Sequence, residues 1–258
     1  MNLFLRYSSV LLLSIILISC QAEIVPDYDR EQNIKDQILD YIIDADLVTL
    51  QSSIGNEFIL MENLNSNSST SILLLHGRGS HPDEPNIINP LRTNLDMTSI
   101  YSLQLPVLSK GKTYREYSSI FKYSTNRIQQ AINYIVDNNN NDIIIIAHSC
   151  GVHMLMDYIE KFSTNYITAV ILIGAGAVDK NESMAEPYPY ESIKIPVLNI
   201  YGENDHGSVL HNALIFNEFT QTTFHKKSEQ IKIIGSNHDH IDNQKILLDI
   251  VKKWLKSL

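Results

Sequence analysis

Residues 147–151 read Ala-His-Ser-Cys-Gly and place Ser149 next to Cys150. Either side chain can attack an acyl carbon, the serine with the help of a base and the cysteine as a thiolate. The apolar residues 143–146 before the motif predict a buried strand, and the stretch from about Gly151 to Lys161 predicts a helix. A strand-to-helix turn can hold a nucleophile above the edge of a sheet. The alternative is a turn of small residues between two packed elements.

The residues around the turn distinguish the two candidate nucleophiles. A sharp nucleophile turn needs small residues two positions before and two positions after the attacking residue, because neighbouring backbone passes close there. Ala147 and Gly151 meet this requirement for Ser149. The same test for the cysteine finds His148 and Val152, which are both too large. Ser149 is therefore the predicted nucleophile.

A serine hydroxyl needs a base, and the base needs a carboxylate to orient it. Of the nine histidines, His238 follows the apolar run I-K-I-I-G, and His240 is its rival two residues later. Asp205 follows the apolar run P-V-L-N-I-Y-G and is the predicted acid. Glu203 and Asp179 stay open as alternative acids. Aspartate is also common in ordinary turns, so the residue type of Asp205 alone does not indicate a catalytic acid. The prediction depends on its position directly after a strand.

Three motifs together resemble a known superfamily. The chain contains H-G-R-G-S-H-P at 76–82, L-Q-L-P at 103–106 and A-H-S-C-G at 147–151, and its nucleophile, acid and histidine follow one another in that order. This pattern resembles the α/β-hydrolases, and within them an uncharacterised bacterial family with H-G-x-G-x-H-P, L-Q-L-P and A-H-S-x-G. The resemblance implies a mostly parallel sheet with helices on both faces. The first position of the superfamily turn is usually glycine and is alanine here.

The resemblance also implies an oxyanion hole, the pair of backbone amides that stabilises the negative oxygen of the acyl-transfer intermediate. One amide should be that of Cys150, the residue after the nucleophile. The other should come from the loop that begins at His76, with Arg78 as the predicted donor and Gly77 as its neighbouring alternative. A plain glycine turn is the other interpretation of this loop.

Composition and missing motifs exclude other classes of site. The formal net charge is −9 and no basic stripe is present, so a nucleic-acid partner is not expected. The sequence N-H-D-H at 237–240 offers metal ligands, but the zinc motif H-E-x-x-H is absent, so no metal is predicted. The phosphate loop G-x-x-x-x-G-K-[ST] is also absent, and G-A-G-A at 174–177 lacks the full dinucleotide fingerprint. No cofactor is predicted.

The N-terminus resembles a lipoprotein signal. An apolar segment from Val10 to Ile18, too short to span a bilayer, leads into L-I-S-C, which ends at Cys20 and resembles a bacterial lipobox. This predicts a lipidated Cys20 in a bacterial cell envelope. Gln21 favours the outer membrane, with the protein facing the periplasm. An ordinary signal peptide cut near Ala22 and a short anchor helix are the alternatives.

The predicted organisation has three parts: a signal peptide at 1–19, a tether at 20–28 and one α/β-hydrolase domain at 29–258. Short apolar strands alternate with amphipathic helices, which predicts a mostly parallel sheet covered on both faces. Strands are expected at 57–62, 72–75, 99–106, 143–146, 167–174, 196–202 and 231–235, and helices at 29–45, 86–97, 118–137, 151–161, 211–219 and 242–256. The first two strands are expected to pair as a hairpin.

These observations favour a membrane-anchored serine hydrolase that cleaves an ester or related acyl bond. Ser149 would attack, His238 would transfer the proton and Asp205 would orient the histidine. The substrate is expected to be a small or lipid-like acyl compound, and the sequence leaves its identity and the oligomeric state open. The rival hypothesis is a non-catalytic envelope lipoprotein that uses the fold for binding or assembly.

Overall fold

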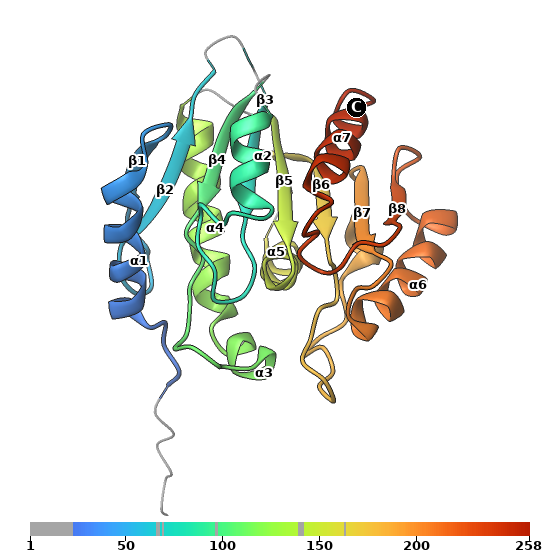
Figure 1. Cartoon of the computed structure of the whole chain (residues 1–258), viewed down its shortest axis with the longest axis horizontal. Coiled ribbons are helices and arrows are strands. Elements are labelled where there is room, and N and C mark those ends of the chain that lie inside the picture. Colours follow the sequence, from blue (N-terminus) through green and yellow to red (C-terminus); the bar gives the residue numbers. More distant parts are fainter. Residues whose placement is uncertain (1–22, 66–67, 69, 96–97, 139–141, 163) are drawn as a thin grey trace, which may run out of the picture.

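The structure is a computed structural model that describes residues 23–258, apart from 66–67, 69, 96–97, 139–141 and 163 (Figure 1). The predicted signal peptide and Cys20 lie outside the described residues. Pro26 is already buried, and the Asp27 amide donates to the carbonyl oxygen of Val107 at 2.8 Å. The first helix begins at Tyr28, next to the expected start of the domain.

The described residues form one eight-stranded sheet. The strands are β1 (Asp46–Leu50), β2 (Phe58–Asn63), β3 (Thr70–Leu75), β4 (Ser99–Leu103), β5 (Asp142–His148), β6 (Ile167–Ile173), β7 (Val197–Gly202) and β8 (Glu229–Ile233). Their order across the sheet is β1-β2-β4-β3-β5-β6-β7-β8. The pairs β1–β2 and β2–β4 are antiparallel and the other five pairs are parallel, so the sheet is mostly parallel and the predicted α/β class is confirmed.

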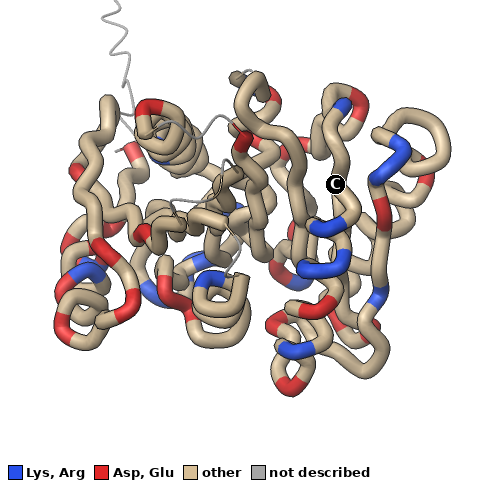
Figure 2. The backbone as a smooth tube through the Cα atoms, turned by 90° about the horizontal axis from the view of Figure 1, so that it is seen from above, with Lys and Arg blue, Asp and Glu red and all other residues tan. Residues whose placement is uncertain are grey.

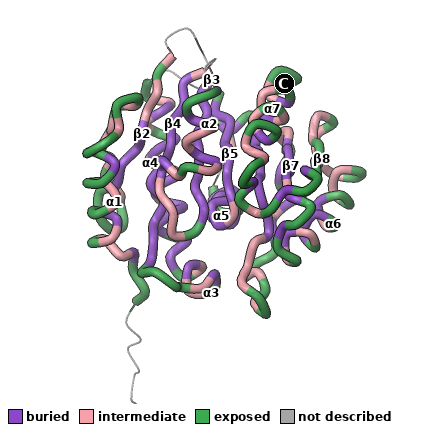
Figure 3. The backbone as a smooth tube through the Cα atoms, in the orientation of Figure 1, coloured by how far each residue is buried: buried purple, intermediate pink, exposed green. Residues whose placement is uncertain are grey.

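The helices cover both faces of this sheet. They are α1 (Tyr28–Tyr41), α2 (Ile88–Asn94), α3 (Tyr114–Ser118), α4 (Phe121–Asp137), α5 (Cys150–Lys161), α6 (Gly207–Thr222) and α7 (Gln244–Leu255), with a 3-10 turn η1 (Tyr190–Ser192). Leu73 and Leu75 belong to the core on the side of α4, α5 and α6, and Ile72 and Leu74 to the core beneath α2 and α7. The central strands are therefore buried on both sides (Figure 3), which explains their continuous apolar runs.

The predicted hairpin between the strands near 57–62 and 72–75 is wrong. β4 lies between β2 and β3, and Leu75 has Leu103 on one side and Ala147 on the other. β3 is buried on both faces and pairs with a parallel strand at each edge. β2 instead pairs antiparallel with β4 and with β1, and the mixed burial of β1 gives that strand no apolar run in the sequence.

The L-Q-L-P motif after β4 belongs to a buried polar frame. Gln104 accepts a hydrogen bond from the Ile59 amide at 2.9 Å and donates to the Glu31 carbonyl oxygen at 3.1 Å. The Glu31 carboxylate pairs with the Arg127 guanidinium at 2.7 Å, and both side chains are almost completely buried. Removing one partner of such a pair typically costs about 3–5 kcal/mol. This frame therefore fixes α1 and α4 against the edge of the sheet where the parallel strands end.

Charged residues are distributed over the molecule. Figure 2 shows segments with Lys or Arg and segments with Asp or Glu interspersed over the molecule. No helix among the described residues has the length and apolar character needed to cross a membrane.

Candidate active site

Ser149 occupies a strained turn between β5 and α5. Its φ of 54° and ψ of −119° lie in a region that non-glycine residues rarely adopt. Its amide donates to the carbonyl oxygen of Ile173 on β6 at 2.8 Å, and its carbonyl oxygen accepts from the Val152 amide at 3.0 Å. These bonds hold the backbone in place, so the side chain extends from the carboxyl end of the central strand.

Close approach of the backbone explains the small residues around the turn. A Cβ atom added to Gly151 would lie 2.6 Å from the carbonyl oxygen of His76 and 2.8 Å from that of Leu75. Both distances are too short for a carbon atom, so the crossing of β3 and α5 requires glycine here. Ala147 is fully buried on the other side of Ser149.

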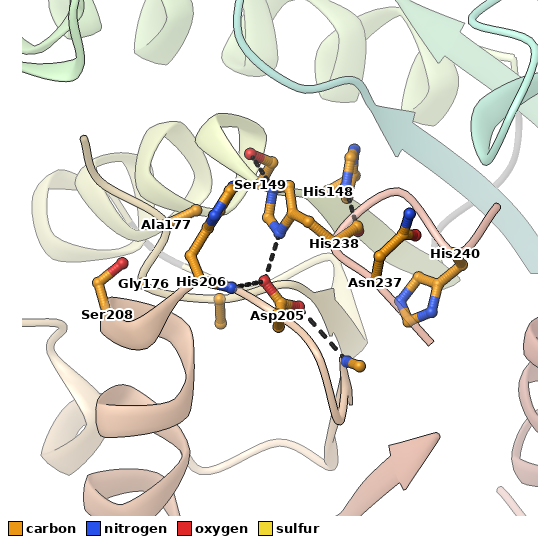
Figure 4. Close-up of polar contacts among 12 residues, drawn as sticks. His148, Ser149, Gly176, Ala177, Asp205, His206, Ser208, Asn237, His238 and His240 are labelled. Atoms are coloured by element: carbon orange, nitrogen blue, oxygen red, sulfur yellow. Dashed lines mark hydrogen bonds and ion pairs between the residues drawn. The ribbon is translucent and has the colours of Figure 1, made fainter. Parts of the chain in front are cut away.

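Ser149, His238 and Asp205 form a continuous hydrogen-bonded chain (Figure 4). Ser149 Oγ lies 2.8 Å from His238 Nε2, and His238 Nδ1 lies 2.7 Å from Asp205 Oδ1. A carboxylate only accepts hydrogen bonds, so Nδ1 carries the proton and Nε2 accepts from the serine hydroxyl. The structure thus brings together the three predicted residues from the loops after β5, β7 and β8.

The environment of Asp205 keeps its carboxylate ionised. Burial opposes ionisation, but the hydrogen bond and charge of His238, together with the amides of His206 and Gly202, outweigh it and lower the Asp205 pKa. The His206 amide donates at 2.7 Å. Asp205 can therefore stabilise positive charge that develops on His238.

The alternative acids lie elsewhere. Glu203 accepts a hydrogen bond from the Gly235 amide at 3.0 Å. Asp179 forms a two-pronged ion pair with the Arg78 guanidinium and accepts from the Tyr114 amide at 2.6 Å. Neither carboxylate contacts the histidine beside Ser149.

The rival base, His240, faces away from the serine. Its Nδ1 lies 2.7 Å from Ser236 Oγ, and the residue is completely buried with a positive φ of 49°. Burial lowers its pKa to about 4. Its position is that of a structural residue beneath the loop that carries His238.

The predicted oxyanion donors lie next to Ser149. Cys150 is the first residue of α5, and the first amides of a helix have no partner within the helix. Arg78 lines the same cavity as Ser149, and a Cβ on its neighbour Gly77 would lie 3.3 Å from the Ser149 Cβ. The Cys150 thiol is buried, which raises its pKa to about 12 and keeps it neutral.

Two further histidines flank His238, and the sequence predicts a role in the site for neither of them. The ring of His148 lies 5.1 Å from that of His238, and the ring of His206 lies 4.4 Å from it. His148 is buried, which lowers its pKa well below the ordinary value, and its Nε2 lies 3.3 Å from the His238 carbonyl oxygen. The signal in the sequence is the position of His148, directly before the predicted nucleophile Ser149.

The histidine of the H-G-R-G motif holds the loop of Arg78. His76 Nδ1 lies 2.8 Å from the Gly77 carbonyl oxygen, and His76 Nε2 accepts from the Leu105 amide at 3.0 Å. Burial lowers the pKa of His76 to about 3, so the ring stays neutral and can donate at one nitrogen and accept at the other. His76 thereby joins the loop after β3 to the L-Q-L-P segment.

Comparison with protein families identifies the chain. Residues 109–257 match the model of the family described as "Protein of unknown function (DUF3530)". The chain belongs to this family. A search of curated proteins finds no match.

Solved structures share the fold of this DUF3530 member. An esterase from Thermogutta terrifontis aligns with a TM-score of 0.61 at 12% identity, over 83% of this chain and 99% of its own. A lid-less α/β serine hydrolase from Xanthomonas campestris aligns with a TM-score of 0.60 at 9% identity, over 84% of this chain and 96% of its own. The esterase RhEst1 from a Rhodococcus species aligns with a TM-score of 0.61 at 13% identity, over 84% of this chain and 100% of its own. At these identities the similarity establishes the α/β-hydrolase fold.

A cavity of about 520 Å³ opens over Ser149. It lies between the loop that carries Arg78 and the segment after β6 that carries Asp179, and the ion pair of these two residues joins its walls. The carboxylate of Asp179 also binds the first amide of α3. The segment after β6 is therefore fixed to α3 across the cavity.

One group of side chains in the described part of the chain could hold a metal ion. His148, His238 and Asp239 each offer one ligand atom within 4.8 Å of the others. Both ring nitrogens of His238 already have partners, in Ser149 and Asp205. The arrangement around His238 suits proton transfer better than metal binding.

Proposed function

We propose that this protein is a serine hydrolase that cleaves an ester or related acyl bond. The observation that carries the proposal is the chain of two hydrogen bonds, 2.8 Å and 2.7 Å long, that links Ser149 through His238 to Asp205. Nucleophile, base and acid within hydrogen-bond reach are the arrangement that acyl transfer requires. The strained backbone at Ser149 and the neighbouring amide of Cys150 support the same function.

In the first half of the reaction, Ser149 Oγ attacks the acyl carbon while its proton moves to His238 Nε2. The negative charge on the former carbonyl oxygen is stabilised by the amides of Cys150 and Arg78. When this tetrahedral intermediate collapses, the bond to the leaving oxygen breaks. His238 gives its proton to that oxygen, so a neutral alcohol leaves and the acyl group stays on Ser149.

In the second half, a water molecule takes the place of the alcohol. His238 removes a proton from the water, and the resulting hydroxide attacks the acyl carbon. Collapse of the second intermediate breaks the bond to Ser149 Oγ, which regains its proton from His238. The ionised Asp205 stabilises the imidazolium in both halves. The residues account for every proton moved, and the cycle needs no cofactor.

The proposal includes a lipid anchor at Cys20 in a bacterial envelope membrane, most simply the outer membrane with the domain in the periplasm. The described chain begins at Glu23, at the edge of the sheet where the parallel strands end (Figure 1). Glu23 pairs with Lys122 at the start of α4, so the first described residue lies at this edge. An acylated Cys20 would hold the opening over Ser149 close to the membrane surface. An intact mass of the membrane-purified protein without the added acyl groups would refute the anchor.

A fluorophosphonate probe tests the hydrolase proposal, because it reacts with activated serines. The protein without its signal should be labelled, whereas Ser149→Ala and His238→Ala should lose the label. His240→Asn should keep the label, since the partner of His240 is Ser236 and the histidine beside Ser149 is His238. A folded sample that the probe does not label would favour the rival hypothesis of a binding or assembly protein.

A further inference from the structure

Tyr114 separates the cavity over Ser149 from a second cavity of about 240 Å³, and it lines both. We infer that Tyr114 limits the acyl group to a short chain, and that the substrates are short-chain acyl esters of polar alcohols. This inference rests on the proposed function, because it assigns substrate groups to the two sides of Ser149.

The side chains around Ser149 suit a polar substrate. The cavity lining includes the polar residues Arg78, Lys180, Asp239 and Asn86 beside a small apolar part formed by Tyr114, Cys150, Ala177 and Val178. A long alkyl chain would have to lie against charged and amide groups and remove water from them, which is unfavourable. A short acyl group is small enough to be covered by the apolar part alone. The polar alcohol portion of the ester then contacts the polar part of the lining.

The direction of proton transfer places the two parts of the ester. His238 must protonate the leaving oxygen, so the alcohol lies on the side of His238, where His206 and Asp239 also line the cavity. The acyl group then points the other way, past Cys150 toward Tyr114. The ring of Tyr114 packs against those of His153 on α5 and Phe121. Neither of these contacts involves His238.

Tyr114 is held rigidly in this position. Its hydroxyl accepts a hydrogen bond from the Ala185 amide at 3.0 Å, and its own amide donates to Asp179 at 2.6 Å. Its ring lies 4.5 Å from that of His153 and 6.1 Å from that of Phe121, and only 2% of the residue is exposed. A side chain fixed at both ends and on its ring forms a wall that a substrate cannot easily displace.

The second cavity could accept more of an acyl chain if the wall were removed. Its lining includes the apolar or aromatic residues Phe121, Met156, Tyr188 and Pro189, together with the carboxylates of Asp157, Glu160 and Glu186. The His153 ring between them is held by the Ala177 carbonyl oxygen and the Tyr188 hydroxyl, each at 3.0 Å. Burial lowers the His153 pKa to about 4, so the ring is neutral at physiological pH.

The first test measures kcat/KM of the wild-type protein for 4-nitrophenyl acetate, butanoate, hexanoate and octanoate. We expect the highest values for acetate or butanoate and a steady fall for the longer esters. An octanoate value equal to or above that of butanoate would overturn the inference. This measurement needs no variant, so it gives a result even where a substitution impairs folding.

The second test opens the wall with Tyr114→Leu. Each methylene that gains burial should raise kcat/KM about fourfold, so octanoate should gain at least about tenfold relative to butanoate. Tyr117→Leu is the control, because Tyr117 is equally buried in the same helix and lines neither described cavity. Adding Ser118→Phe at the rim of the second cavity should cancel the gain. An unchanged chain-length profile in folded Tyr114→Leu would contradict the role of the wall.

The outcomes separate this inference from the proposed function. Absence of fluorophosphonate labelling at Ser149 in the folded wild-type protein would refute the proposed hydrolase function. Labelling at Ser149 together with a preference for long-chain esters would refute only the short-chain inference. Labelling together with short-chain preference, shifted by Tyr114→Leu and not by Tyr117→Leu, is the result that the structure predicts.

Discussion

Lowering the pH should unfold this protein through its buried histidines. His76, His153 and His240 are between 0% and 3% exposed, and burial lowers their pKa values to about 3, 4 and 4, from an ordinary value of 6.5. In the unfolded chain these rings take up protons as the pH falls below about 6.5, whereas in the folded protein they do not. The stability that depends on them is therefore complete above that pH and is lost as the pH falls toward 4.

The size of the effect follows from linkage. A pH of about 5 lies roughly 1.5 units below the pKa of each ring in the unfolded chain, and the three rings are still neutral in the folded state. Each ring therefore lowers the free energy of unfolding by about 2 kcal/mol. Together they remove about 6 kcal/mol, against a total stability of about 5–15 kcal/mol for a typical domain. His148, whose pKa is also lowered by burial, adds to the loss in the same direction.

Urea unfolding at pH 7.5, 6 and 5 measures this loss. Trp254 is the only tryptophan and is 3% exposed, so its fluorescence reports the transition. His240→Asn should reduce the loss between pH 7.5 and 5 by about 2 kcal/mol, because asparagine tolerates the positive φ at this position and does not titrate. His211→Gln, at an exposed position on α6, is the matched control. An equal loss in the wild-type and His240→Asn proteins would show that protonation of His240 does not destabilise the fold.

Three further substitutions test the geometry around Ser149. Gly174→Ala should lower kcat on a chromogenic ester by about 10²-fold, because φ is 63° and the new Cβ would lie 2.7 Å from the His238 ring; a wild-type rate would contradict the close approach. Cys150→Ala should keep kcat within a few-fold, since the amide remains, and a loss as large as that of Ser149→Ala would give the sulfur a role. Arg78→Ala should cost less than the roughly 10²–10³-fold expected for a missing oxyanion donor, measured with the same ester; a larger loss would place the guanidinium in the chemistry.

Local rules in the sequence predict three residues, Ser149, Asp205 and His238, that the structure brings together. The test for small neighbours selected Ser149 because the backbone crossing at Gly151 is a local steric requirement. Asp205 and His238 were identified by their positions after apolar strands, since the carboxyl ends of parallel strands meet at one edge of the sheet. The carboxylate and the histidine therefore lie together although 33 residues separate them in the chain.

The interactions that the sequence did not predict are mainly non-local. Insertion of β4 between β2 and β3 depends on pairing between distant segments, and a polar turn does not specify the partner of a strand. The Arg78–Asp179 ion pair joins residues 101 positions apart and carries no local pattern. The short helix α3 is not among the predicted helices, although the sequence contains a sign of it. Thr113 and Glu116 form a capping box at its start, a pattern typical of the first turn of a helix. That helix carries Tyr114, the wall of the cavity.

The proposed reaction requires that Ser149 becomes covalently acylated. The most direct measurement is peptide mass spectrometry of the protein after reaction with diethyl 4-nitrophenyl phosphate, with fragment ions that distinguish Ser149 from Cys150. We predict one diethylphosphoryl group on Ser149, and its absence in His238→Ala over the same reaction time. A modification on Cys150, or none on a folded protein, would contradict the account.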